Sequence, residues 1–231
     1  MENDYLTIND SCPVIADTTL DTEKELAILF LDIRNFTGLM EAQSGQSVIQ
    51  VVRRLFTAFN QIIKNFQGKV VEIAGDNLYA VFGLQTNVRE AANNAYQAAK
   101  MMFKTVNMFN AAYAEPYYGG PLEIGVGLNT GRVFVGEFAI DGPPVLSVMG
   151  LPVNIASRLQ AKTKELNNDL IISENAYSLL DNDGAAFEQQ TVRLQGISQG
   201  QQIRLAGKPY NNGHYLAGSQ QNMDYLLAIS G

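Results

Sequence analysis

Residues 26–31 form a continuous apolar run, and this run constrains the fold more than any other feature of the chain. A strand of this composition is typically buried on both faces of a sheet, so other elements must cover both faces. From residue 47 to residue 66 the apolar side chains recur at helical spacing, and Gly68 follows as a stop signal. The sequence therefore predicts a central strand and, after it, a long amphipathic helix.

The rest of the chain alternates between strand and helix patterns. The Gly-Asp-Asn turn around Asp76 predicts a hairpin with this aspartate at its tip, and Asn87 with Glu90 three residues later predicts a helix N-cap. The expected strands cover residues 26–31, 69–74, 78–82, 122–128, 133–138, 145–149, 170–172, 187–194 and 201–205. The expected helices cover residues 47–66, 86–113, 152–162 and 173–180. The order strand, helix, hairpin, helix, strand predicts an α+β fold with a ferredoxin-like βαββαβ core, extended by extra strands and helices.

Length and composition limit the organisation and the class of function. No internal repeat or linker divides the 231 residues, so we expect one domain at residues 24–206 between tails at residues 1–23 and 207–231. The net charge of -7 argues against nucleic-acid binding by phosphate neutralisation. The sole cysteine, Cys12, fits a reducing compartment, and the sole histidine, His214, excludes histidine metal sites and Ser/His triads. With an acidic N-terminus and no apolar stretch of membrane-spanning length, the sequence predicts a cytoplasmic protein without a membrane span.

Two aspartates at chain reversals are the candidate chemical groups. Asp32 ends the apolar strand, and Asp76 lies at the hairpin tip. This arrangement can place two carboxylates side by side at one edge of a sheet, where two divalent cations can bridge them to a polyphosphate. Either aspartate alone is better explained by the local backbone hydrogen bonds that aspartates make in turns.

A second pair of polar residues, Asn154 and Arg158, is one helical turn apart in residues 153–159. This spacing puts an amide and a guanidinium on one face of the expected helix. The alternative is a solvated polar face opposite the packed side of that helix.

Residues 30–37, 75–83 and 153–159 together resemble the class III nucleotidyl cyclases, which convert nucleoside triphosphates to 3',5'-cyclic monophosphates and pyrophosphate. The resemblance extends over residues 24–206 and implies the class III cyclase fold. It also implies a head-to-tail homodimer, because in this family the metal-binding and transition-state residues meet across a subunit interface. One subunit would supply Asp32, Ile33, Thr37, Asp76 and Arg132, and the other would supply Glu72, Ser147, Asn154 and Arg158.

The resemblance assigns a role to each of these residues. It implies that two Mg²⁺ or Mn²⁺ ions per site are held by Asp32, Asp76 and the main-chain oxygen of Ile33. It implies that Asn154 orients the ribose and that Arg158 neutralises charge developing on the α-phosphoryl group. No side-chain base is then required.

Phosphate contacts are expected from two places. Thr37 and the backbone amides of residues 33–36, including that of Phe36, would form a cradle for anionic oxygens, and Arg132 would grip terminal phosphates. The alternative for Arg132 is an exposed residue at the start of an edge strand. The family more often has glycine in place of Asn35, and a lysine in place of Gln195.

The nucleobase is the least constrained part of the interpretation. An ionised Glu72 accepts hydrogen bonds only, so it favours a base with a ring N–H, which guanine and uracil have and adenine lacks; Ser147 can donate to the adjacent carbonyl oxygen. Arg53, if turned toward the nucleotide, would fill the space of a purine. We therefore favour UTP over GTP, as in bacterial pyrimidine cyclases of anti-phage systems, whose product acts on a separate effector protein. A guanylate or adenylate cyclase of ordinary signalling, or a catalytically silent nucleotide-binding module, remains the alternative.

Overall fold

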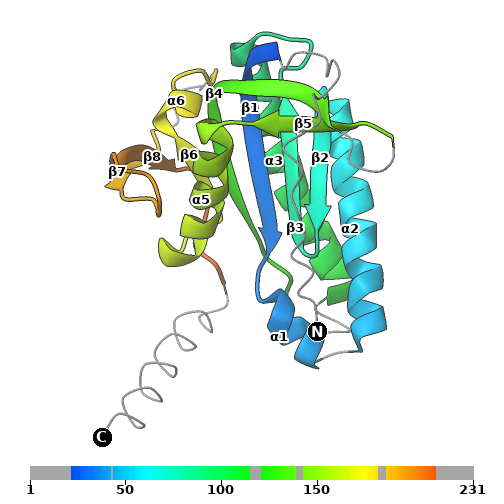
Figure 1. Cartoon of the computed structure of the whole chain (residues 1–231). Coiled ribbons are helices and arrows are strands. Elements are labelled where there is room, and N and C mark those ends of the chain that lie inside the picture. Colours follow the sequence, from blue (N-terminus) through cyan, green and yellow to red (C-terminus); the bar gives the residue numbers. More distant parts are fainter. Residues whose placement is uncertain (1–21, 43, 115–120, 139–142, 182–185, 212–231) are drawn as a thin grey trace, which may run out of the picture.

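The computed structural model describes residues 22–42, 44–114, 121–138, 143–181 and 186–211. Within these residues, eight strands form one mixed sheet in the order β2-β3-β1-β4-β6-β8-β7, and β5 pairs with β4 (Figure 1). The strands are β1 (Thr22–Ile33), β2 (Gly68–Ala74), β3 (Asn77–Phe82), β4 (Ile124–Phe138), β5 (Val145–Met149), β6 (Leu170–Ser173), β7 (Glu188–Val192) and β8 (Gln201–Leu205). The helices are α1 (Phe36–Ala42), α2 (Gly45–Asn65), α3 (Val88–Phe109), the π-helical turn η1 (Asn110–Ala114), α5 (Leu151–Glu165) and α6 (Glu174–Tyr177). The predicted α+β class is confirmed.

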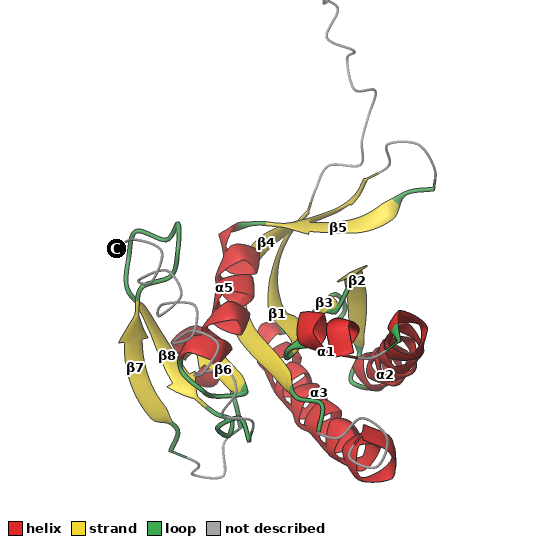
Figure 2. Cartoon of the chain, turned by 90° about the horizontal axis from the view of Figure 1, so that it is seen from below, coloured by secondary structure: helices red, strands yellow, loops and turns green. Residues whose placement is uncertain are grey.

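The apolar run in β1 is the centre of the sheet, as predicted. Ala27, Leu29 and Leu31 pack with α2 and α3 on one face, while Leu26 and Ile28 are buried on the other face. Figure 2 shows α2 and α3 on one side of the sheet and α5 on the other. Both faces of β1 are therefore covered.

Local sequence signals explain where the two long helices begin. The side chain of Ser44 accepts a hydrogen bond from the N–H of Ser47 at the start of α2. The side chain of Asn87 accepts one from the N–H of Glu90 at the start of α3, at 2.9 Å, as predicted. Each cap satisfies a backbone donor that the first helical turn leaves free.

Helix α5 lies unusually close to β4. A Cβ atom at Gly127 would be 2.3 Å from the backbone nitrogen of Gln160 and 2.5 Å from the carbonyl oxygen of Ala156. Only glycine permits this approach. The Nδ2 of Asn129 donates to the carbonyl oxygen of Pro152 at 2.9 Å and fixes the start of the helix on the strand.

Two expectations about boundaries are corrected. The two strands expected at residues 122–128 and 133–138 are one strand, β4, because residues 129–131 stay in the ladder with β1. Residues 207–211, expected as the start of the tail, are part of the fold, because residues 206–211 are hydrogen-bonded to residues 167–170 and to Glu123. We call residues 206–211 the C-terminal strap.

Residues 1–21 and 212–231, which include Cys12 and His214, lie outside the described residues. None of the described helices is both long and apolar enough to cross a membrane.

Candidate active site at the end of the central strands

The structure brings Asp32 and Asp76 together. Asp32 lies at the end of β1, opposite Asn77 of β3, and Asp76 immediately precedes Asn77 in the turn. The backbone N–H of Ile33 donates to the carbonyl oxygen of Asp76 at 3.2 Å, which holds the turn against the end of β1. The carboxyl group of Asp76 is close enough to that of Asp32 to raise its pKa. Figure 1 shows this end of β1 and the β2–β3 turn close to α1.

The environment of Asp32 opposes its negative charge. Burial, and to a lesser extent the neighbouring carboxyl group of Asp76, raise the pKa of Asp32 to about 6, although Arg34 and Gln160 act in the opposite direction. Two adjacent carboxylates with too little compensating charge favour the binding of a cation.

The donor set suits Mg²⁺ or Mn²⁺. Carboxylate and carbonyl oxygens are the ligands that these hard cations prefer, and Mg²⁺ is commonly held by one or two carboxylates, with water and substrate phosphates completing the shell. The described residues contain no group of three or more His, Cys, Asp or Glu side chains that can hold a metal. The Asp32–Asp76 pair therefore fits cations that share their ligands with a phosphate-bearing substrate.

The expected phosphate cradle lies next to this pair. Helix α1 begins at Phe36, and Thr37 is exposed in its first turn. Asn35 has φ 55°, in the left-handed region that glycine adopts easily and asparagine tolerates. The chain therefore makes the sharp turn between β1 and α1 without the family's glycine.

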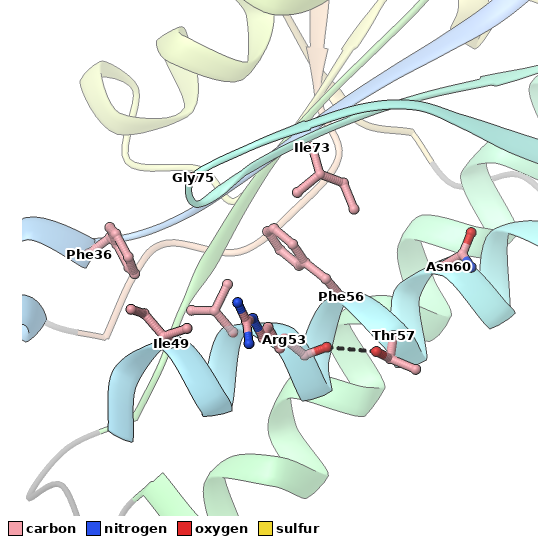
Figure 3. Close-up of a pocket in the computed structure, with 9 residues that line it drawn as sticks. Phe36, Ile49, Arg53, Phe56, Thr57, Asn60, Ile73 and Gly75 are labelled. Carbon is pink, nitrogen blue, oxygen red and sulfur yellow. Dashed lines mark hydrogen bonds between the residues drawn. The ribbon is translucent and has the colours of Figure 1, made fainter. Parts of the chain in front are cut away.

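A cavity of about 700 Å³ opens between α2 and the β2–β3 hairpin. Arg53 extends into it from α2, and Phe36 and Gly75 connect it to α1 and to the turn that carries Asp76 (Figure 3). The Thr57 hydroxyl donates to the backbone carbonyl of Arg53 at 2.8 Å. Arg53 thus lines the same cavity as Gly75, the residue before Asp76.

Glu72 lies on the other face of β2. It is exposed and pairs with Tyr79, whose pKa is raised by burial and by the charge of Glu72. The Tyr79 hydroxyl donates to the carbonyl oxygen of Val148 at 3.4 Å, next to Ser147. The segments of β2 and β5 that carry Glu72 and Ser147 are therefore close to each other. Ile73 lies on the opposite face of β2 and lines the cavity that contains Arg53.

Asn154 and Arg158 are both exposed on α5. The opposite side of the helix is buried against the sheet, and there Gln160 lies beside Asp32. Within one chain the Asn154–Arg158 face therefore points away from the aspartate pair.

The structure places Arg132 far from Asp32 along β4. Asp32 pairs with Gly125 of β4, whereas Arg132, seven residues further along (125 to 132), pairs with Glu25. At roughly 3.3 Å per residue this separation is about 23 Å. Arg132 is exposed and forms an ion pair with Glu23 at 3.6 Å. Gln195 is exposed in the turn before β8.

Three residues near Asp32 were not found from the sequence. Arg34 donates to the Asp32 carboxylate, Gln160 lies beside it, and Tyr210 of the C-terminal strap contacts the guanidinium. Arg34 could have been suspected, because residues two apart on a strand share a face. Gln160 stands out as a polar residue on the apolar side of α5.

Comparisons with known proteins point to one family. The model of the adenylate and guanylate cyclase catalytic domain matches residues 19–210. Adenylate cyclase 1 of Rhizobium meliloti is 25% identical over 151 residues, which cover 65% of this chain and 22% of that protein. The chain thus spans about a fifth of the length of this relative.

Solved structures show the same fold. The crystal structure of the adenylyl cyclase CyaB from P. aeruginosa has a TM-score of 0.73 at 25% identity, over 83% of this chain and 98% of that chain. The guanylate cyclase domain of RhGC from Catenaria anguillulae, solved in complex with GTP, has a TM-score of 0.65 at 23% identity, over 81% of this chain and 99% of that chain.

Proposed function

Since the chain belongs to the adenylate and guanylate cyclase catalytic domain family, we propose that it converts a nucleoside triphosphate to a 3',5'-cyclic nucleotide and pyrophosphate. In this reaction the ribose 3'-oxygen loses its proton and bonds to the α-phosphorus, while the bond from the α-phosphorus to the bridging oxygen breaks and pyrophosphate leaves. The placement of Asp32 at the end of β1 beside the turn that contains Asp76 carries the proposal, because it supplies the acidic pair that such chemistry needs.

Two Mg²⁺ or Mn²⁺ ions would be held by Asp32, Asp76 and the main-chain oxygen of Ile33. When bound, they supply activation of the 3'-hydroxyl and neutralisation of the departing pyrophosphate. Thr37 and the N–H of Phe36 would donate to phosphate oxygens from the first turn of α1.

A second copy of the chain would complete the site. Asn154 and Arg158 face away from their own aspartates, so a head-to-tail homodimer would set them against the aspartates of the other copy, where the partner's Asn154 orients the ribose and the partner's Arg158 donates to the α-phosphoryl group. The outer face of the β4–β5 hairpin supports this, because Phe134 and Met149 lie opposite each other there and are 52% and 59% exposed. Large apolar side chains grouped on a surface favour association.

For the base, we favour UTP, with GTP next. In the dimer, Arg53 would come from the subunit that holds the metal ions, and it would narrow the space beside the Asp76 turn. The partner's Glu72 would accept from the ring N–H of uracil or guanine, and the partner's Ser147 would donate to the adjacent carbonyl oxygen. The cyclic nucleotide would then act as a second messenger for an effector protein during phage infection.

The first experiment incubates the chain with ATP, GTP, CTP and UTP separately in the presence of Mn²⁺ and resolves the cyclic products. We expect a cyclic product, cyclic UMP above the others, that is lost in Asp76→Ala. Cyclic GMP as the main product would instead support a guanylate cyclase. Equal and negligible turnover in wild type and Asp76→Ala would support a catalytically silent module.

Mixing two variants tests the shared site. Asp76→Ala and Arg158→Ala should each be inactive, and their mixture should regain activity, because each mixed dimer has one site with no substituted residue. A mixture as inactive as its components would contradict the homodimer.

A further inference from the structure

A buried guanidinium lies directly behind Asp32. The side chain of Arg34 is 5% exposed, and its Nη2 donates to Oδ2 of Asp32. Among the described residues, the Nε of Arg34 has no hydrogen-bond partner. A buried donor without a partner costs about 1–3 kcal/mol, so this arrangement is not the one that stability alone would select.

The C-terminal strap holds this guanidinium from the other side. The ring of Tyr210 lies against Arg34, with 5.9 Å from Cζ of the arginine to the ring centroid, and Tyr210 is buried. The backbone N–H of Tyr210 donates to Oδ1 of Asn167 at 3.1 Å, and that of Asn211 donates to Oε1 of Glu123 at 2.7 Å. The tyrosine is therefore fixed by its own backbone.

A glycine makes room for these side chains beside the metal ligand. Gly125 is the β4 residue opposite Asp32. A Cβ atom at this position would be 2.9 Å from Nη2 of Arg34, 2.7 Å from the hydroxyl oxygen of Tyr210 and 2.5 Å from Oγ1 of Thr163. The cluster behind Asp32 therefore depends on the absence of a side chain at residue 125.

From these contacts we propose that Arg34 and Tyr210 are positioning residues that hold Asp32 in its cation-binding conformation. The inference rests on the metal site of the proposed function. Arg34 binds one carboxylate oxygen of Asp32 and so fixes the rotamer, which leaves the other oxygen for the cations. Tyr210 holds the plane of the guanidinium in place, so the strap near the end of the chain contributes to the metal site. Groups that orient a metal ligand commonly change metal affinity about 10–100-fold when they are removed.

The test measures the dissociation constant for Mn²⁺ alone, by the electron paramagnetic resonance signal of free Mn²⁺, on the full chain. Arg34→Met keeps the length of the side chain and removes its donors, and we expect it to raise the dissociation constant about tenfold. Tyr210→Leu should raise it by a smaller factor, whereas Tyr210→Phe keeps the ring and should match the wild type. Arg34→Lys should recover part of the loss.

Arg204→Met is the matched control, because Arg204 also pairs with a carboxylate and a tyrosine, Glu174 and Tyr177, elsewhere in the fold. Thermal unfolding of each variant identifies those that fail to fold. The control should lose stability and keep the wild-type affinity. An unchanged or tighter affinity for Mn²⁺ in folded Arg34→Met or, if that variant does not fold, in Tyr210→Leu would overturn the inference.

The same measurements separate this inference from the proposed function. A wild-type chain that binds Mn²⁺ through Asp76, loses affinity in Arg34→Met and forms no cyclic nucleotide would overturn only the proposed reaction. Normal cyclisation together with equal Mn²⁺ affinity in all variants would overturn only the positioning role.

Discussion

Among the residues that the structure describes, two arginine–carboxylate pairs each have a tyrosine ring against the guanidinium, and they differ in how fully their hydrogen bonds are made. In the pair between β8 and α6, Arg204 donates through Nε and Nη2 to both oxygens of Glu174, at 2.7 and 2.9 Å. Its Nη1 donates to the carbonyl oxygen of Phe187 at 3.1 Å, and Tyr177 lies 4.4 Å from its Cζ. This bidentate geometry is the one in which an arginine pair is strongest.

The pair at the end of β1 is less complete. Arg34 makes one hydrogen bond to Asp32, and its Nε has no partner among the residues that the structure describes. Asp76 adds a second carboxyl group beside Asp32, whose pKa burial raises to about 6. Both pairs consist of an arginine, a carboxylate and a tyrosine. In the pair at the end of β1, however, the carboxylate charge and one guanidinium donor are not fully compensated.

The difference separates a structural role from a functional one. A satisfied network contributes rigidity, whereas a partly satisfied one costs stability and is retained where a ligand completes it. In this protein the incomplete pair coincides with the carboxylates that fit divalent cations, and the complete pair does not.

The largest expected effect concerns the two carboxylates. Asp32→Asn should lower turnover by about 10³-fold, because cation contacts supply several kcal/mol of transition-state stabilisation and each 1.36 kcal/mol is about tenfold in rate. Glu174→Gln should leave turnover within about twofold and should lower the free energy of unfolding by about 1 kcal/mol, because it weakens a complete pair. Rates with the preferred triphosphate and urea unfolding without divalent cations measure both quantities. A similar loss of turnover in both variants would remove the functional distinction between the pairs.

The next effect concerns the space beside the Arg34–Asp32 pair. Gly125→Ala should lower the free energy of unfolding by about 2 kcal/mol and weaken Mn²⁺ binding, because the new methyl group would overlap Arg34, Thr163 and Tyr210. Gly200→Ala, just before β8, is the control, because its nearest contact would be a methyl group of Thr191 at 3.2 Å. It should cost less than about 1 kcal/mol and leave Mn²⁺ affinity unchanged. Equal effects of the two substitutions on Mn²⁺ affinity would show that the packing around Gly125 has no specific influence on Mn²⁺ binding.

The elements of the fold could be predicted because they depend on local periodicity. The central strand, the two capped helices and the hairpin all follow from residues close together in sequence. The joining of two expected strands into β4 could not be predicted, because residues 129–131 have the composition of a turn. They remain in the strand because Asn129 bonds to Pro152, which lies on a later helix.

The site was predictable to the same extent. Asp32 and Asp76 were expected together, since each lies where its own strand reverses. The position of Arg132 depends on the register of β4 against β1, which the sequence does not reveal. The burial of Arg34 depends on Gly125 and Tyr210, which are distant in sequence, so its role could be found only in the folded chain.

The smallest expected effect on the candidate site comes from the C-terminal strap, and it tests whether the incomplete hydrogen bonding behind Asp32 extends into this segment. Burial raises the pKa of Asp169 to about 6, although its Oδ1 accepts from the N–H of Lys208 at 2.7 Å. The folded chain therefore binds this proton more tightly than the unfolded chain, and the free energy of unfolding should fall as the pH rises from about 4 to about 6. Asp169→Asn keeps the acceptor and removes the charge, so it should remove the part of this fall that Asp169 causes and stabilise the protein at pH 7 by on the order of 2 kcal/mol. The raised pKa of Asp32 should maintain the rest of the fall.

Urea unfolding between pH 4 and pH 7 measures this effect, with Asp181→Asn as the control. Asp181 is 67% exposed and pairs with Arg89 on the surface, so its neutralisation should change the stability by less than about 0.5 kcal/mol at any of these pH values. If the free energy of unfolding changes with pH in parallel in wild type and Asp169→Asn, the charge of Asp169 is fully compensated by the strap. The incomplete hydrogen bonding would then be confined to the Arg34–Asp32 pair. A shallower fall in Asp169→Asn than in the wild type would mean that the strap shares the uncompensated charge of the proposed metal site.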